Sequence, residues 1–194
     1  EQEVTEKLYL YSKVFTHAKS KCKYIYNRFP TKDSTINLVL DKCQTQQERA
    51  GVYSLIAFKN PGRALPELKK IVSLNPHLDV TDILLIREVN KIEHWLLSNN
   101  YTSYGYYDYW SNMDGEKKYD QIKLKKDTHY AKDLLKFCEK TVNSKNCPAN
   151  KVLWQTSVAY LQFLLGDYKT TNKTILTIDV AETTSESKAQ LDII

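Results

Sequence analysis

The residues with the most distinctive chemistry form a cluster of aromatic side chains just past the middle of the chain. Its members are Tyr101, Tyr104, Tyr106, Tyr107, Tyr109 and Trp110. Tyrosine and tryptophan combine a large rigid ring with a polar tip, so they are enriched in binding surfaces, including those for sugars. We therefore predict that this cluster contacts a partner. The alternative is that the rings fold back and fill a groove between helices.

A second group of polar residues lies at helical spacing shortly before the aromatic cluster. Arg87, Lys91 and His94 fall on one face of a predicted helix, and Glu88 is placed to pair with Lys91. One interpretation is an anion-binding patch inside a groove. The alternative, favoured by the amphipathic pattern, is the ordinary polar side of a packed helix.

Signatures of catalysis and of metal binding are absent from the sequence. The four histidines, His17, His77, His94 and His129, include no pair at i,i+4. There is no G-x-S-x-G, Walker or G-x-G-x-x-G motif, and five glycines could hardly build a phosphate cradle. We therefore expect no catalytic residue, no metal and no cofactor, although an enzyme with a dispersed site stays open as an alternative.

The cysteines do not follow a zinc-binding or redox pattern, because none of the four forms a C-x-x-C pair. Cys138 and Cys147 flank a short predicted connection between helices and could meet as a disulfide. The spacing leaves a second interpretation open, in which the residues are unlinked thiols. Cys22 and Cys43 lie on neighbouring predicted helices and allow the same two interpretations.

The net charge of the chain is modestly basic, at +5 from 28 Lys and Arg against 23 Asp and Glu. The window from Glu116 to Lys136 holds seven lysines and four acids, which is typical of a solvated polar face. Arginine is rare, which weakens any case for bidentate phosphate recognition. We predict no nucleic-acid partner, and no segment is apolar enough to predict a membrane span.

Apolar residues recur at three-and-four spacing along most of the chain, which indicates helices. The helices expected are Val4–Arg28, one beginning at Asp33-Ser34, Gln46–Phe58, one beginning at Asn60-Pro61, Thr81–Ser98, Thr128–Val142, Asn150–Leu165, Tyr168–Ile178 and one from Ser185 to the end. The periodicity fails between them over 98–127, which predicts an irregular Tyr-rich insertion. Short links between consecutive helices predict antiparallel neighbours.

Two stretches resemble tetratricopeptide repeats. In one, Ala159, Gly166, Tyr168 and Ile175 match the small, turn, aromatic and large apolar positions of the repeat. In the other, Ala64, Leu68, Ile71 and Pro76 match its second helix and closing proline. The match is partial, since Thr171 stands where the repeat prefers alanine. The resemblance implies an all-α, right-handed superhelix of antiparallel helix pairs with one long aromatic loop.

The sequence thus predicts one helical-repeat domain over 1–194, a fragment or processed part of a longer chain. The resemblance implies a non-enzymatic scaffold that binds a protein or peptide partner. A glycan-binding protein of the bacterial cell envelope, which would use the aromatic loop, is the second hypothesis. The Lys-, Asn-, Ile- and Tyr-rich composition favours the bacterial envelope as the compartment, periplasmic or surface, with the cytoplasm as the alternative.

Overall fold

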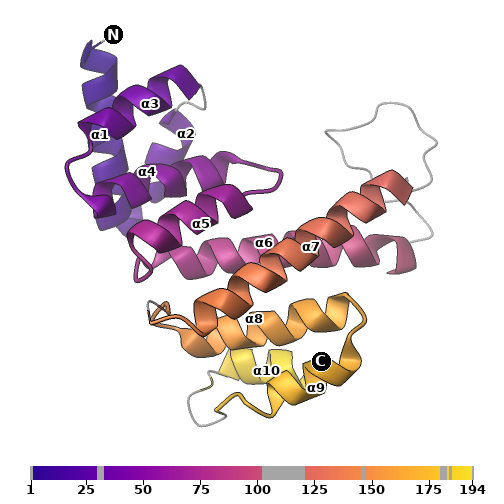
Figure 1. Ribbon diagram of the computed structural model, residues 1–194. Coiled ribbons are helices and arrows are strands. Elements are labelled where there is room, and N and C mark those ends of the chain that lie inside the picture. The colour runs from indigo at the N-terminus through magenta and orange to yellow at the C-terminus, as the bar shows by residue number, and fades with distance from the viewer. Residues whose placement is uncertain are drawn as a thin grey trace. The chain divides into compact units, whose positions relative to one another are not determined.

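The structure is all-helical in the residues that it describes. This computed structural model describes residues 2–29, 33–101, 121–145, 147–179, 183 and 185–193. Over this part of the chain helices account for 81%, in ten α-helices, and there is no strand (Figure 1). The prediction of an all-α class is confirmed. No helix in the described part is long and apolar enough to cross a membrane.

The chain divides into two compact units, residues 1–85 and 86–194. The division falls within helix α6 (Val80–Tyr101), so the start of α6 is counted with unit 1 and the rest with unit 2. That the whole chain behaves as one domain stays a prediction.

Unit 1 is built around α4, which packs against α1, α2, α3 and α5. Its helices are α1 (Gln2–His17), α2 (Cys22–Arg28), α3 (Asp33–Lys42), α4 (Gln46–Lys59) and α5 (Leu65–Leu74). The buried side chains come from all of the first four helices. They include Leu8, Phe15, Ile25, Phe29, Val39, Val52 and Leu55.

The first helix is broken where the sequence predicts continuity from Val4 to Arg28. α1 ends at His17, and a 3-10 turn at Lys19–Lys21 leads into α2. The Thr16 hydroxyl donates to the carbonyl oxygen of Lys13 at 2.9 Å, a back-bond that tends to bend a helix. The expectation of one helix over Val4–Arg28 is wrong. The three-and-four spacing of apolar residues continues across the break, although the residues before and after it lie on separate helices.

Gly51 lets α4 approach α1 closely. A Cβ atom at this position would lie 2.6 Å from Cγ2 of Thr16, so only glycine fits without a shift. The start of α4 is fixed by a capping box, in which the Thr45 hydroxyl accepts from the Glu48 amide and the Glu48 carboxylate accepts from the Thr45 amide. The capping box at the start of α4 and the close approach at Gly51 together place α1 against α4.

The boundary at Asn60 differs from the prediction. We expected Asn60 to begin a helix, but it lies at the end of α4, and its side-chain oxygen accepts from the Gly62 amide at 2.9 Å. An Asx turn of this kind competes with helix initiation. α5 begins instead at Leu65, and Pro66 lies in its first turn as predicted.

Unit 2 is built around α8 (Lys151–Leu164), which packs against α7 (Gln121–Val142), α9 (Tyr168–Ile175) and α10 (Ser185–Ile193) (Figure 1). Trp154 and Leu161 of α8 are fully buried, as expected for a helix that is apolar nearly all round. The ring of Trp154 meets Phe137 of α7 edge-on, with centroids 6.0 Å apart.

Gly166 makes the tight turn between α8 and α9. Its φ is +80°, a conformation that favours glycine. The Asp167 amide donates to the Gln162 carbonyl and the Gly166 amide to that of Phe163, which together close α8 in a Schellman motif. Asp167 then caps α9, because its carboxylate accepts from the Thr170 amide. The predicted turn glycine is confirmed.

The helices beside the predicted irregular segment are longer than expected. α6 continues to Tyr101 rather than ending at Ser98, and α7 begins at Gln121 rather than at Thr128. The first turns of α7 expose their apolar residues, Ile122 at 60% and Leu124 at 40%. With no buried stripe, this part of α7 gives no helical periodicity to detect. The prediction that 98–127 is irregular is therefore wrong at both of its ends.

Candidate functional site

The aromatic cluster predicted as a contact surface lies almost wholly outside the described residues. Tyr101 is the last residue of α6. Tyr104, Tyr106, Tyr107, Tyr109 and Trp110 fall outside the part of the chain that the structure describes. The role of this cluster stays a prediction, and it contributes nothing to the geometry below.

The predicted polar group on α6 surrounds a buried carboxylate. Arg87 and Lys91 are half-buried and His94 is exposed. Glu88 is fully buried, and its Oε1 lies 2.6 Å from Nζ of Lys91, so the predicted pairing of these two residues is confirmed. Tyr130 of α7 donates its hydroxyl to the other carboxylate oxygen. The cluster therefore links α6 to α7 within unit 2.

This buried cluster is better suited to holding helices together than to chemistry on a ligand. Both oxygens of Glu88 are already engaged inside the fold, and Lys91 neutralises its charge. The Tyr130 ring also packs against Trp95, with centroids 6.0 Å apart. A buried charge needs such partners, because an uncompensated charge in the interior is very costly. The geometry does not favour an anion site at Lys91.

Metal-binding and reactive-thiol chemistry have little support in the described residues. No group of three or more His, Cys, Asp or Glu side chains comes together there. The cysteines are thiols, so no disulfide joins Cys138 to Cys147. Burial raises the pKa of the Cys138 thiol far above its usual range, and burial likewise raises that of Cys43. Neither buried residue is set up as a nucleophile.

A surface that combines exposed apolar, aromatic and cationic side chains lies on α1 and α2. We call it the α1–α2 face and define it by the following residues: Lys7, Leu10, Tyr11, Val14, Tyr24 and Arg28. The first four recur at i, i+3, i+4 and i+7, so they share one side of α1. Leu10 is 50% exposed, Val14 37% and Tyr24 50%, whereas Leu8 and Phe15 of α1 are buried.

Four side chains of this face form a continuous stack across the two helices. The ammonium of Lys7 lies 5.7 Å from the Tyr11 ring centroid, and Tyr11 meets Tyr24 of α2 edge-on at 6.3 Å. The guanidinium of Arg28 then lies 3.8 Å from the Tyr24 centroid. Each cation is held against the negative face of a ring, so both charges are presented on a preorganised aromatic support.

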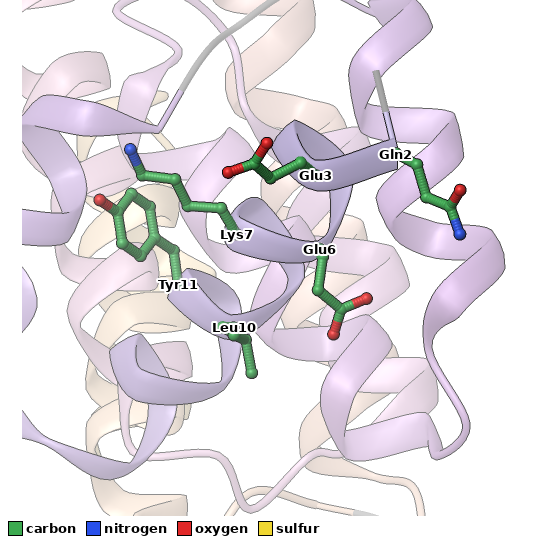
Figure 2. Close-up of a pocket in the computed structure, with 6 residues that line it drawn as sticks. All are labelled: Gln2, Glu3, Glu6, Lys7, Leu10 and Tyr11. Atoms are coloured by element: carbon green, nitrogen blue, oxygen red, sulfur yellow. The ribbon is translucent and has the colours of Figure 1, made fainter.

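The face borders an open hollow along α1 of about 670 Å³. Figure 2 shows its lining, with Lys7 and Tyr11 side by side. The lining residues are Gln2, Glu3, Glu6, Lys7, Leu10 and Tyr11. All six belong to one helix and all are exposed except the half-buried Tyr11. Among the described residues the hollow thus has a wall on one side only, which suits a partner surface better than an enclosed small molecule.

A polar network on another side of α1 fixes the position of the face. Nζ of Lys13 lies 3.0 Å from Oε1 of Glu48, and the Tyr9 hydroxyl donates to the same oxygen at 3.0 Å. Burial alone would raise the pKa of the Glu48 carboxyl. Hydrogen bonds from Lys13, the Gln44 amide and Tyr9 outweigh burial and lower this pKa to about 2. The pKa of Lys13 is raised by its hydrogen bond with Glu48.

Sequence reasoning missed this face, although the charge pattern carries a signal for it. Between Glu6 and Asp33 the chain has seven Lys and Arg residues and no Asp or Glu. This stretch is more basic than Glu116–Lys136, the window on which the charge argument above rests. The exposed Leu10 and Val14 lie next to positions of the buried apolar spacing, Leu8 and Phe15, so that spacing alone does not reveal them.

Comparison of the chain with models of protein families, with curated proteins and with solved structures finds no match.

Proposed function

We propose that this chain is a non-enzymatic binding module that contacts a protein partner through the α1–α2 face. The observation that carries the proposal is a second apolar stripe on α1. Leu8 and Phe15 already anchor this helix in the core, yet Leu10 and Val14 are 50% and 37% exposed beside the Lys7–Tyr11 pair. Contiguous exposed apolar side chains rimmed by polar ones tend to mark interaction sites on soluble proteins.

The chemistry of the face also resembles that of protein interfaces. Tyrosine and arginine are the residue types enriched at interface centres, because they offer large contact area together with polar recognition. Here Tyr24 and Arg28 are both exposed and stacked on each other, so little conformational freedom would be lost on binding. An open hollow next to them gives a partner helix or loop room to lie along α1.

A repeat architecture is the second part of the proposal. The α8–α9 pair, joined by the Gly166 turn, has the connection expected of one tetratricopeptide-like unit. Ala159 is fully buried on α8, as the small position of such a unit requires. We propose that the chain is a degenerate helical-repeat scaffold, with binding the function that such scaffolds commonly serve.

The two alternatives are less well supported by the described residues. The glycan-binding alternative depends on the aromatic loop, whose residues Tyr104–Trp110 lie outside the described part of the chain. An enzyme needs a substrate to reach converging titratable groups. In the set around the buried Glu88, both carboxylate oxygens are already engaged by Lys91 and Tyr130.

A site-specific crosslinking experiment tests the proposal. A photo-reactive amino acid is placed at Leu10 in one variant and, as the control, at Leu176, which is 86% exposed in unit 2. Proteins crosslinked in the native host are identified by mass spectrometry, purified and titrated against the unmodified chain. We expect a partner crosslinked from position 10 and not from position 176, with saturable binding. Equal crosslinking from both positions, or no saturable binding, would contradict the proposal.

A further inference from the structure

We infer that the partner's docking segment is an acidic amphipathic helix, with apolar residues for α1 and carboxylates for the cations around it. This inference rests on the proposed function and specifies the chemistry of the partner. It is argued from the distribution of charge on the face and from the positions of its apolar residues.

The charged residues that define the α1–α2 face, Lys7 and Arg28, are both cations. The two carboxylates that line the bordering hollow, Glu3 and Glu6, lie N-terminal to Lys7, and Glu6 is paired with Lys42. Lys7 and Arg28 mark the two ends of the stack, and the exposed Lys21 and Lys23 lie at the start of α2. No acidic residue occurs between Glu6 and Asp33 to neutralise them. Lys13, the other described cation of α1, is already paired with Glu48. The charges of Lys7 and Arg28 thus lie on the face that also exposes Leu10 and Val14, so an acidic partner is complementary to them.

The apolar component indicates a helix as the shape of the partner segment. Leu10 and Val14 lie one turn apart, with Tyr11 beside them, which gives a short ridge along α1. A second helix with apolar residues at i, i+3, i+4 and i+7 can pack on such a ridge. Its flanking carboxylates would then lie near Lys7 on one side and near Arg28 on the other.

Two other anionic partners are less well matched to the face. Single-stranded nucleic acid binds by stacking bases on open rings, but Arg28 occupies one face of Tyr24, and Tyr11 meets that ring edge-on. An anionic membrane needs a larger apolar area than Leu10 and Val14 provide for stable binding. A carboxylate-bearing helix uses both the cations and the ridge, so it is the partner that the face favours.

A designed peptide tests the inference on the intact chain. The probe is a fluorescent helical peptide with leucines at i, i+3, i+4 and i+7 and glutamates elsewhere, titrated by fluorescence anisotropy. A second peptide has the same composition in scrambled order. We expect saturable binding of the patterned peptide, about tenfold weaker for the scrambled one, and weaker binding as salt increases. Equal affinity for both peptides would overturn the inference.

Charge variants locate the site. Lys7→Glu with Arg28→Glu should weaken binding of the patterned peptide by about tenfold or more. Lys132→Glu with Lys140→Glu, two exposed lysines of α7, changes the net charge by the same amount and should leave binding nearly unchanged. Equal losses in the two variants would show unspecific attraction and overturn the inference. Circular dichroism confirms that both variants are folded.

The remaining outcomes separate the inference from the proposed function. A native partner crosslinked from Leu10 whose binding is insensitive to salt and to the Lys7 and Arg28 changes would leave the proposed function intact and overturn the acidic helix. Tighter binding of a single-stranded oligonucleotide, or of phosphatidylserine vesicles, than of the patterned peptide would also overturn it. If neither a native partner nor the patterned peptide binds at the α1–α2 face, both the proposed function and the acidic helix are contradicted.

Discussion

The guanidinium of Arg28 lies over the ring of Tyr24 one turn earlier on α2, with its carbon 3.8 Å from the ring centroid. An exposed cation–π pair of this kind contributes about 0.5–1 kcal/mol. We predict a coupling energy of this size from a double-mutant cycle with Arg28→Ala and Tyr24→Ala, measured by urea unfolding. A cycle with Lys23 and Tyr24, adjacent residues on the same helix, serves as the control and should show coupling near zero. Coupling near zero in both cycles would show that the stack is not held in solution.

Gly51 provides a test of the packing that positions α1. Gly51→Ala places a methyl group 2.6 Å from Cγ2 of Thr16, which is too close, so the Thr16 side chain or the two helices must shift. We expect a loss of about 1–3 kcal/mol in the free energy of unfolding. Gly62→Ala, whose Cβ would meet only the side-chain oxygen of Asn60 at 3.3 Å, is the control and should cost less. Equal losses would mean that α1 and α4 do not approach closely at Gly51.

The Glu48 network predicts a pH dependence of stability. The pKa of Glu48 is lowered in the folded state to about 2 from an ordinary value of 4.5. A lowered folded-state pKa means that the stabilisation is complete above pH 4.5 and is lost as the pH falls toward 2. We expect Glu48→Gln to cost about 1–2 kcal/mol at pH 7, after allowance for solvent screening, and almost nothing near pH 2.

Unfolding curves across pH 2–7 measure this difference. Glu3→Gln, an exposed carboxylate on α1, is the matched control. It should change stability by no more than about 0.5 kcal/mol. A Glu48→Gln penalty that stays constant across this pH range would show that the ion pair with Lys13 is not responsible for it.

The helical class and most helix positions could be predicted from the sequence, because buried apolar spacing is a strong local signal. The predictions fail where that signal is ambiguous or missing. Val4–Arg28 reads as one helix since the spacing continues across the break at Ala18, and the first turns of α7 expose Ile122 and Leu124. The Asn60 side chain bonds locally to Gly62, so a residue that resembles an N-cap ends a helix instead.

The candidate site was harder to predict than the fold. The Glu88–Lys91 pair follows from its i,i+3 spacing, but the hydroxyl of Tyr130 comes from a helix far along the chain, and local spacing cannot show it. The α1–α2 face likewise depends on Tyr11 meeting Tyr24, which requires the turn between α1 and α2. The one sign of this face in the sequence was the stretch between Glu6 and Asp33, which has seven Lys and Arg residues and no acidic residue.

The buried cluster in unit 2 predicts a large structural effect with a simple control. Glu88→Ala leaves Lys91 and the Tyr130 hydroxyl without their shared partner, so we expect a loss of about 3–5 kcal/mol. Tyr130→Phe removes one hydrogen bond and keeps the ring on Trp95, so it should cost about 1–3 kcal/mol. Glu93→Ala, on the same helix and half-buried, should cost less than either. Chemical denaturation measures all three, and a Glu88→Ala loss below about 1 kcal/mol would contradict a structural role.

The measurement that tests the central claim most directly compares affinity and stability in one variant of the α1–α2 face. Leu10→Ser with Val14→Ser removes the exposed apolar ridge and leaves the buried Leu8 and Phe15 in place. We predict that this variant unfolds within about 1 kcal/mol of the parent chain, while its Kd for the partner crosslinked at position 10 rises by about tenfold or more. An unchanged Kd with unchanged stability would contradict the claim that this face binds a partner. A large loss of stability would contradict it as well, because these side chains would then belong to the core.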